Sequence, residues 1–203
     1  MSKIDDMMAE LCPDGVEYKR LESLLRYEQP GKYLVKSTAY SDDYDTPVLT
    51  AGKTFLLGYT DETEGIYPAS KESPVIIFDD FTTDFKWVDF PFKAKSSGMK
   101  MLSPATQEFS FRYVYYAMLM IGFRPLDHKR HWISEVSKFE IPVPPIEIQQ
   151  EIVRVLDSFA ELEAELEAEL EAELEARKKQ YAYYRDQLLA FGNTEMQRER
   201  ETF

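Results

Sequence analysis

The sequence has little of what disulfide or metal chemistry needs: one cysteine, Cys12, and two histidines, His128 and His131, among 203 residues. A single cysteine excludes an internal disulfide and fits a reducing compartment, so we expect a cytoplasmic location. These three residues lack the spacing of a zinc site, and we expect no metal and no cofactor. The longest apolar runs, such as residues 75–78, are too short to span a bilayer. No cationic start precedes an apolar run, so we expect neither a secretion signal nor a membrane partner.

Catalytic patterns are also scarce. Neither histidine lies near an obvious serine or cysteine motif, and no glycine-rich loop of the kind that binds a methyl donor is present. We therefore expect a protein that is not an enzyme. One enzymatic alternative stays open, because Asp79 or Asp80 after an apolar strand, then Asp84 and Lys86, resembles the metal-dependent nuclease pattern of two carboxylates and a lysine. The spacing is shorter than the usual two-strand arrangement of such sites.

The net charge of −13 is unevenly distributed along the chain. Residues 1–85 hold seventeen acidic and eight basic side chains, and residues 151–175 hold ten acidic and one basic. Residues 86–138 instead hold nine basic and four acidic side chains. A local basic surplus is what a nucleic-acid-binding surface requires, although surface charge varies along any chain.

Short apolar runs between Tyr33 and Met101, separated by turn clusters, are typical of β-strands. An aromatic-rich helix is predicted over residues 109–121, and the prolines of residues 141–145 predict an extended segment. We therefore predict an α+β fold, a small β-rich α/β domain followed by one long C-terminal helix. The predicted divisions are an N-terminal segment 1–20, a domain 21–145, a helix 146–192 and a polar tail 193–203.

The unit Ala-Glu-Leu-Glu repeats four times between Ala160 and Glu175. These residues favour helix, and neither glycine nor proline interrupts the chain from Pro145 to Gly192. This predicts one helix of about 46 residues, or roughly 70 Å, with Gly192 as its C-terminal cap. Each repeat adds roughly 6 Å, so the helix suits a spacer whose length is counted in identical units.

The apolar side chains of this helix form a slowly drifting stripe, which needs a partner to be stable. We expect a second copy to pair with it as an antiparallel coiled coil. A single solvated acidic helix is the alternative. The stripe that we expect to make the pair consists of Ile152, Phe159, Leu162, Leu166, Leu170, Leu174 and Tyr181.

Several short motifs occur in an order that resembles the specificity subunits of type I restriction-modification systems. Each motif alone is weak, but the ordered set covers both ends of the chain and is specific. The motifs are CPDGVEY at 12–18, WIS at 132–134, IPVPP at 141–145, IEIQQEIV at 146–153, ARKKQY at 176–181 and YRDQLL at 184–189.

The resemblance implies a DNA sequence-recognition subunit that binds one half of a bipartite site on double-stranded DNA. It also implies methyltransferase subunits as partners, with motor-nuclease (restriction) subunits as additional ones. Family members usually carry two target-recognition domains and two helices, whereas this chain has one of each. Two copies would therefore rebuild the frame and read an interrupted palindrome, unless the partner is a different specificity chain. The chain also has Glu where family repeats often have Thr, in Thr-Ala-Glu-Leu.

Within the target-recognition domain, DNA contacts need donors and acceptors for base edges, and cations or small hydroxyls for phosphates. Segment 93–100, with three lysines and two serines, is the best phosphate candidate, and an ordinary basic hairpin turn is its alternative. The candidate DNA-binding residues are Lys53, Thr54, Ser70, Lys71, Asp80, Thr82, Thr83, Lys93, Lys95, Ser96, Ser97, Lys100 and Lys129.

A third class of function is a coiled-coil adaptor that does not bind DNA. Such a protein would explain the repeat and the overall acidity. It would leave the basic loops and the ordered motifs without an explanation, and a DNA-binding assay in the presence of the methyltransferase separates the two.

Overall fold

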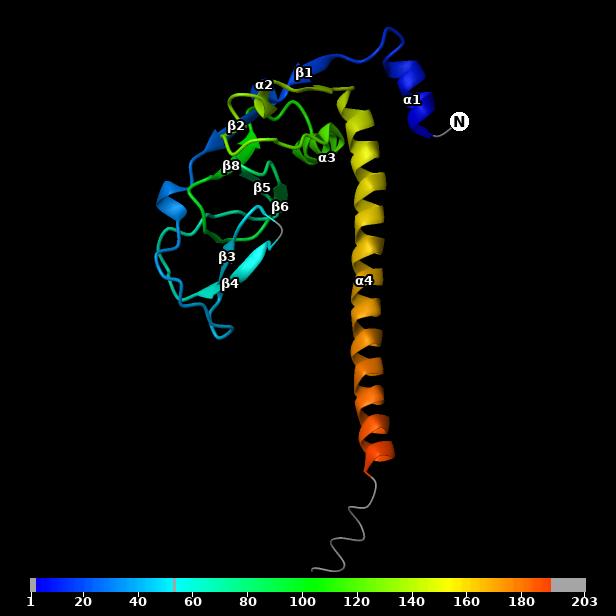
Figure 1. The fold of residues 1–203 in the computed structure, drawn as a ribbon. Coiled ribbons are helices and arrows are strands. Elements are labelled where there is room, and N and C mark those ends of the chain that lie inside the picture. The colour runs from blue at the N-terminus through cyan, green and yellow to red at the C-terminus, as the bar shows by residue number, and fades with distance from the viewer. Residues whose placement is uncertain (1–2, 53, 191–203) are drawn as a thin grey trace, which may run out of the picture. The chain divides into compact units, whose positions relative to one another are not determined.

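The computed structural model describes residues 3–52 and 54–190 of the chain (Figure 1). Two compact units are present, residues 1–153 and residues 154–203, and the division falls inside the last helix. Within the described residues, no helix is both long enough and apolar enough to cross a membrane.

The first unit holds every strand. Its helices are α1 (Lys3–Leu11), α2 (Leu21–Leu24), the 3-10 turns η1 (Gly31–Tyr33) and η2 (Val136–Lys138), α3 (Phe111–Ile121) and the first turns of α4 (Ile146–Leu189). Its strands are β1 (Tyr18–Arg20), β2 (Leu25–Glu28), β3 (Thr46–Leu49), β4 (Leu56–Thr60), β5 (Val75–Asp79), β6 (Phe85–Val88), β7 (Lys93–Ala94), β8 (Met99–Pro104) and β9 (Glu140–Pro142). The mixed architecture confirms the predicted fold class, while the pairing of the long helix stays a prediction.

The strands form three sheets (Figure 1). A four-stranded antiparallel sheet has the order β2-β8-β5-β6, and a three-stranded sheet has the order β4-β3-β7. In the smaller sheet β3 and β7 run parallel, with Val48 opposite Lys93 and Leu49 opposite Ala94. The third sheet is the antiparallel pair β1-β9, which joins segments about 120 residues apart in the sequence.

Strand β5 lies at the centre of two apolar cores. Successive side chains of a strand point to opposite faces of the sheet. Ile76 and Phe78 accordingly pack in the core that contains α3, whereas Val75 and Ile77 pack in the core that contains the three-stranded sheet. The continuous run of buried residues in β5 therefore reflects a sheet that is covered on both faces.

Helix α3 begins and ends at residues that sequence reasoning can recognise. The Ser110 hydroxyl accepts a hydrogen bond from the Tyr113 amide, as expected of a helix N-cap. Gly122 adopts a left-handed conformation with φ of 59°, and this ends the helix, as predicted. The predicted start at Phe109 is two residues early, since Phe109 is buried in the core before the cap.

The first turns of α4 belong to the first unit. Gln149 is almost completely buried, where its amide nitrogen donates to the Pro144 carbonyl and its oxygen accepts from the Ser110 amide. Glu151 accepts a hydrogen bond of 3.0 Å from the ammonium of Lys3 in α1. The unit therefore extends past Pro145, the predicted end of the domain, to Val153.

In the second unit, helix α4 continues to Leu189 and its leucines are exposed. Leu162 and Leu174 expose 53% and 54% of their surfaces, and Leu166 and Leu170 expose 59% and 66%. Phe159 and Tyr181 are also exposed. Ile152 corrects the predicted stripe, because it packs half-buried against the core of the first unit. The proposed cap Gly192 and the tail 193–203 lie outside the described residues.

Candidate nucleic-acid interface

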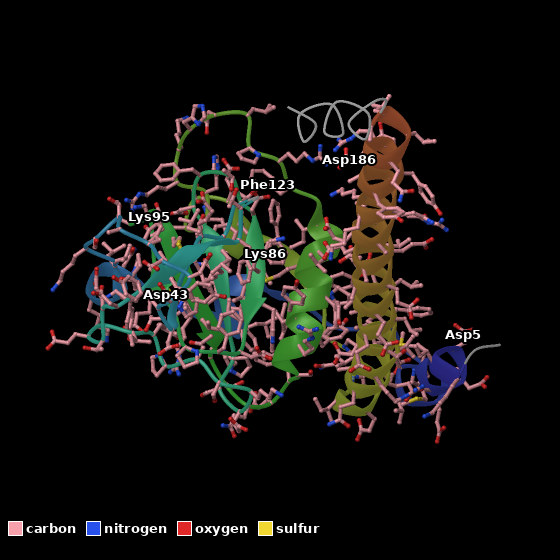
Figure 2. The ribbon with its side chains drawn as sticks, turned by 90° about the horizontal axis from the view of Figure 1, so that it is seen from below. Asp5, Asp43, Lys86, Lys95, Phe123 and Asp186 are labelled. Carbon is pink, nitrogen blue, oxygen red and sulfur yellow. The ribbon has the colours of Figure 1, made fainter. Side chains whose placement is uncertain are left out.

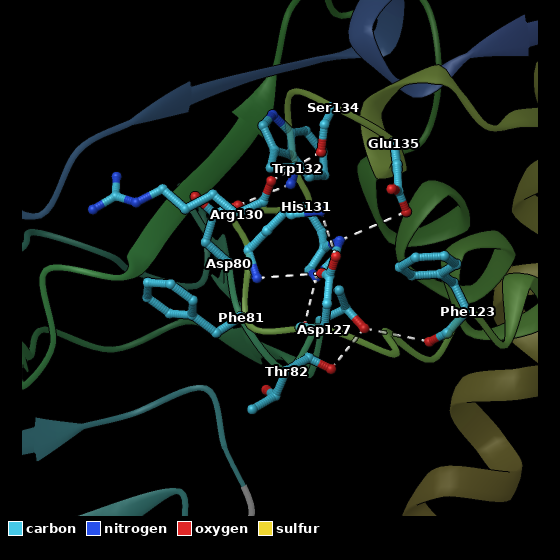
Figure 3. Close-up of polar contacts among 12 residues, drawn as sticks. Asp80, Phe81, Thr82, Phe123, Asp127, Arg130, His131, Trp132, Ser134 and Glu135 are labelled. Carbon is cyan, nitrogen blue, oxygen red and sulfur yellow. Dashed lines mark hydrogen bonds and ion pairs between the residues drawn. The ribbon is translucent and has the colours of Figure 1, made fainter.

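Asp80 is the residue on which three loops of the first unit converge (Figure 3). Its Oδ2 atom lies 2.9 Å from the ammonium of Lys100, and its Oδ1 atom accepts a 2.8 Å hydrogen bond from the Trp132 amide. The Asp80 amide donates to the Gly98 carbonyl, and the Asp80 carbonyl accepts from the His131 amide. One buried residue thus ties together the β5–β6 turn (79–84), the β7–β8 turn (95–98) and the α3–η2 loop (122–135).

The β5–β6 turn has its own internal support. The Asp79 carboxylate accepts hydrogen bonds from the amides of Phe81 and Thr82, at 2.9 and 3.0 Å. Thr83 has a φ of 62°, which is uncommon for a residue other than glycine. Its hydroxyl lies 3.3 Å from the Phe123 carbonyl, and this contact ties the turn to the end of α3. Strained backbone of this kind persists where the surroundings hold it in place.

A fourth loop reaches the same edge through the parallel pair of β3 and β7. Parallel strands end on the same side of a sheet, so the β3–β4 turn (50–55) and the β7–β8 turn are neighbours. The amide of Lys95 donates to the Leu49 carbonyl at 3.0 Å, which confirms their proximity. Lys95 and Phe123 lie toward the same edge of the unit in Figure 2. The four loops together form a surface that we call the loop edge.

Of the sequence-predicted residues, the loop edge exposes Thr54, Thr82, Lys95, Ser97 and Lys129. The Lys95 ammonium lies 5.6 Å from the centre of the Tyr40 ring, within range of a cation–π contact. Half-buried Ser96 is in the same turn, where its hydroxyl accepts from the Gly98 amide. Lys53 is outside the described residues.

Four predicted residues need correction, because the structure buries them. Lys93, Lys100 and Asp80 each expose 1% of their surface, and Thr83 exposes 8%. Each buried lysine pairs with a carboxylate, Lys100 with Asp80 and Lys93 with Glu62, as buried charge requires. These four residues support the loops from inside and have no surface to offer a nucleic acid.

Lys93 and Glu62 form the second of these internal pairs, with the ammonium and carboxylate 2.9 Å apart. Partial burial alone would raise the pKa of Glu62. Hydrogen bonds from the Ser37 amide, the Lys93 ammonium and the Lys36 amide outweigh it and lower the pKa to about 2. The Lys93 ammonium also donates to the Glu64 carbonyl at 2.6 Å. Through these contacts, Lys93 of β7 holds the segment 62–64, which follows β4.

Ser70 and Lys71 lie away from the loop edge. Their turn precedes Val75, the first residue of β5, whereas the β5–β6 turn follows the last. The Ser70 hydroxyl donates to the Glu72 carboxylate at 2.9 Å and accepts from the Ser73 amide at 3.1 Å. Both hydrogen bonds stabilise the turn itself, so the structure does not bring this pair together with the other candidates.

The exposed side chains of the loop edge that were missing from the predicted set include Phe81, Arg124, His128 and Arg130. The carbon Cζ of the Arg130 guanidinium lies 5.8 Å from the centre of the Phe81 ring, and Figure 3 shows the two side by side. Arg124, His128, Lys129 and Arg130 form a basic cluster that is recognisable in the sequence, although the predicted set includes only Lys129 from it. Phe81 carried no such signal, since aromatic residues of a small β-rich domain usually fill the core.

His131 anchors the α3–η2 loop from inside. Its side chain is 4% exposed, and its Nε2 atom lies 3.2 Å from the Asp127 carbonyl and 3.3 Å from that residue's carboxylate. Its Nδ1 atom lies 3.6 Å from the Glu135 carboxylate. The Asp127 carboxylate is also 2.8 Å from the Lys129 ammonium. That hydrogen bond is the largest cause that lowers the pKa of Asp127 and raises the pKa of Lys129.

A cleft of about 880 Å³ separates the β5–β6 turn from the start of the α3–η2 loop. Its lining combines apolar side chains such as Phe85 and Met118 with exposed polar ones. The exposed charged and polar side chains on this lining are Thr82, Asp84, Lys86, Arg124, Asp127 and His128. The loop edge therefore has a groove on this side that is lined by both cations and carboxylates.

The nuclease alternative finds no support in the geometry. Asp80 is buried against Lys100, and the carboxylate of Asp79 caps the turn. Asp84 is exposed and does not join them in a cluster. Within residues 3–52 and 54–190, no group of three or more His, Cys, Asp or Glu side chains is arranged to hold a metal ion.

The model of one protein family, described as "Type I restriction modification DNA specificity domain", matches residues 13–176. The chain is 56% identical over 196 residues to the type I restriction enzyme EcoR124I/EcoR124II specificity subunit of Escherichia coli. That alignment covers 91% of this chain and 47% of the relative. A second relative, the EcoprrI specificity subunit of Escherichia coli, is 56% identical over 73 residues, or 32% of this chain and 18% of its own length.

Solved structures share the fold. The type I restriction-modification S subunit from M. genitalium superposes with a TM-score of 0.64 at 16% identity, over 86% of this chain and 47% of that one. A second solved chain comes from a structure that describes complex assembly and conformational transition of the type I R-M system. It superposes with a TM-score of 0.55 at 15% identity, over 90% of this chain and 50% of that one. This chain thus spans about half the length of the relatives that it matches.

Proposed function

Because this chain belongs to the type I restriction-modification DNA specificity family, we propose that it recognises one half of a divided site on double-stranded DNA. The observation that carries the proposal is the loop edge. Three loops meet there around one buried residue, Asp80, a fourth joins them through β3 and β7, and together they expose cations and hydroxyls. Loops that are held rigidly by buried contacts and expose polar and cationic side chains suit a protein that must present several side chains to DNA at once.

Electrostatics supports the same placement. The basic surplus of the sequence falls in residues 86–138, which contain the β7–β8 turn and the α3–η2 loop. The repeat helix is strongly acidic and would repel phosphates at close range. DNA contacts therefore belong to the first unit and not to the repeat. The exposed residues that we assign to these contacts are Thr54, Thr82, Lys86, Lys95, Ser97, Arg124, His128, Lys129 and Arg130.

We further propose that two copies of the chain associate through the repeat helix. Leucine side chains more than half exposed along a 44-residue helix leave an apolar stripe that a second helix would cover. The relatives are about twice as long as this chain, which fits two copies in the place of one longer subunit. A symmetric pair would recognise an interrupted palindrome.

In this proposal the chain is a non-catalytic cytoplasmic subunit. Methylation is supplied by methyltransferase subunits that dock on the pair, and a restriction subunit is a further partner. The alternative of a DNA-independent adaptor would leave the convergence of three loops on Asp80 without an explanation.

The experiment is to co-express the chain with the methyltransferase of its own system and to map methylated positions across the host genome. The proposal predicts a new motif that is an interrupted palindrome. An asymmetric two-part motif would keep the recognition function and replace the second copy by a different specificity chain. No new methylation, with both proteins folded and associated, would overturn the proposal.

A further inference from the structure

Arg130 is held in place by its backbone more firmly than its exposure suggests. Its carbonyl accepts a 2.9 Å hydrogen bond from the Ser134 hydroxyl. The next residue, His131, donates its amide to the Asp80 carbonyl at 2.9 Å and is almost completely buried. The Cα atom of Arg130 is therefore fixed relative to the centre of the loop edge, while its side chain is exposed to solvent.

Phe81 restricts the Arg130 side chain in turn. The guanidinium carbon lies 5.8 Å from the centre of the ring, within the range of a cation–π contact. The ring packs closely over Gly98, where an added Cβ atom would lie 2.6 Å from Cε2 of Phe81. Only a residue without a side chain leaves room for the ring, so three loops cooperate to position one guanidinium.

Lys129 and Arg130 differ in their pairing although they are neighbours in sequence. The Lys129 ammonium is 2.8 Å from the Asp127 carboxylate, which already offsets its charge. The Arg130 guanidinium instead contacts the Phe81 ring, and among the described residues no carboxylate forms an ion pair with it. Its donors are therefore available, and they are presented from a defined position.

A planar guanidinium with paired donors matches the O6 and N7 acceptors of guanine in the major groove. A cation–π contact with an aromatic ring restricts the guanidinium and reduces the entropy lost on binding. A guanidinium can also bind a phosphate through paired donors, but a phosphate contact carries no sequence information, so a dependence on the base at one position distinguishes the two.

We propose that Arg130 reads a guanine in each half-site and that Phe81 is its positioning residue. This inference rests on the proposed function, and it specifies which base is recognised and which side chain recognises it. Arg130→Lys keeps the charge and loses the paired donors, so the substitution separates base reading from phosphate binding.

The test uses the complex of the full chain with its methyltransferase. DNA binding is measured against sites in which each guanine of the wild-type motif is replaced in turn, at several salt concentrations. We expect Arg130→Lys to lose about 10- to 100-fold of the discrimination at one guanine, with the dependence of binding on salt unchanged. The methylated motif should become degenerate at that guanine alone.

Phe81→Leu tests the positioning residue. It should reduce discrimination at the same guanine, by less than Arg130→Lys does, and the double variant should be no worse than Arg130→Lys alone. Phe81→Tyr retains an aromatic ring and should restore discrimination. If Phe81→Leu abolishes binding to all sequences, or has no effect, Phe81 is not the positioning residue of Arg130.

Two matched variants complete the design. Lys129→Ala should weaken binding to all sequences alike and reduce the salt slope by about one, as a phosphate contact does. Lys71→Ala, an exposed cation that lies away from the loop edge, should change neither quantity. If Arg130→Lys leaves the motif unchanged, or if Arg130→Ala behaves like Lys129→Ala, Arg130 is not a base reader. If the wild-type complex binds every sequence equally, the proposed function falls as well.

Discussion

The ammonium of Lys100 lies 2.9 Å from the Oδ2 atom of Asp80, and neither side chain exposes more than 2% of its surface. A buried ion pair of this kind contributes to a defined arrangement more than to stability, but removal of one partner leaves an uncompensated buried charge. The pair is therefore the point at which the loop edge is most sensitive to mutation.

We predict that Asp80→Ala lowers the free energy of unfolding by about 3–5 kcal/mol. Urea denaturation of the purified chain measures this. The double variant Asp80→Ala/Lys100→Met removes both charges and should recover part of the loss. A loss under about 1 kcal/mol in the single variant would mean that the buried pair contributes little.

Gly98→Ala should disturb the loop edge without unfolding it. The new Cβ atom would meet Phe81 at 2.6 Å, and the partly exposed ring can swing aside, so we expect less than about 1 kcal/mol of destabilisation. Discrimination at the guanine assigned to Arg130 should fall as it does in Phe81→Leu. Gly31→Ala, with nothing within 4 Å of its Cβ position, is the matched control and should bind normally.

The lowered pKa of Glu62 predicts that the free energy of unfolding depends on pH. Its pKa falls from 4.5 to about 2 on folding, so its contribution is complete above pH 4.5 and is lost as the pH falls toward 2. Glu62→Gln should flatten the dependence of the unfolding free energy on pH within this window. Thermal unfolding at a series of pH values provides the measurement. Parallel curves for the two proteins would show that Glu62 has its ordinary pKa in the folded state.

Leu166→Gln with Leu170→Gln should convert a pair of chains into single chains. Both leucines are more than half exposed in one chain, so the first unit should keep its stability. Light scattering coupled to size-exclusion chromatography measures the mass. The matched variant Glu165→Gln with Glu169→Gln changes two neighbouring carboxylates and should leave the pair intact. Equal masses for both variants and the wild type would contradict pairing through the stripe.

Deletion of residues 160–163 should shorten the helix by about 6 Å, the length of roughly two base pairs, in each copy. We expect the gap between the half-sites to shrink while the bases of each half-site stay the same. Mapping of methylated positions in the host genome gives both quantities. Altered half-site bases with a constant gap would contradict the use of the helix as a spacer.

The sequence predicted strands β3 to β6 and helices α3 and α4, but not strand β8 inside the larger sheet. The apolar runs near residues 47–50, 55–57, 74–78 and 86–90 correspond to β3, β4, β5 and β6. Local signals were sufficient there, because strand propensity and turn residues act over a few positions. Helix α3 ended at Gly122 and helix α4 began at Ile146 for similar local reasons.

The candidate site was less predictable, because its partners are distant in sequence. Segment 93–100 resembled an exposed basic turn, yet Lys93 and Lys100 are buried. Each finds its carboxylate, Glu62 or Asp80, 31 or 20 residues earlier in the chain. No local pattern shows which lysines have such a partner, and only tertiary structure separates these two from the exposed Lys95.

The antiparallel pair of β1 and β9 places Arg20 opposite Glu140 and Tyr18 opposite Pro142. The backbone thus enters and leaves the rest of the unit through adjacent strands, and both sheets, α3 and the loop edge lie between them in the sequence. A different segment that starts and ends on the same two strands could replace this one and leave α4 unchanged. Under the proposed function, exchange of this segment between genes would give a new DNA specificity while α4 and the two anchoring strands stay the same.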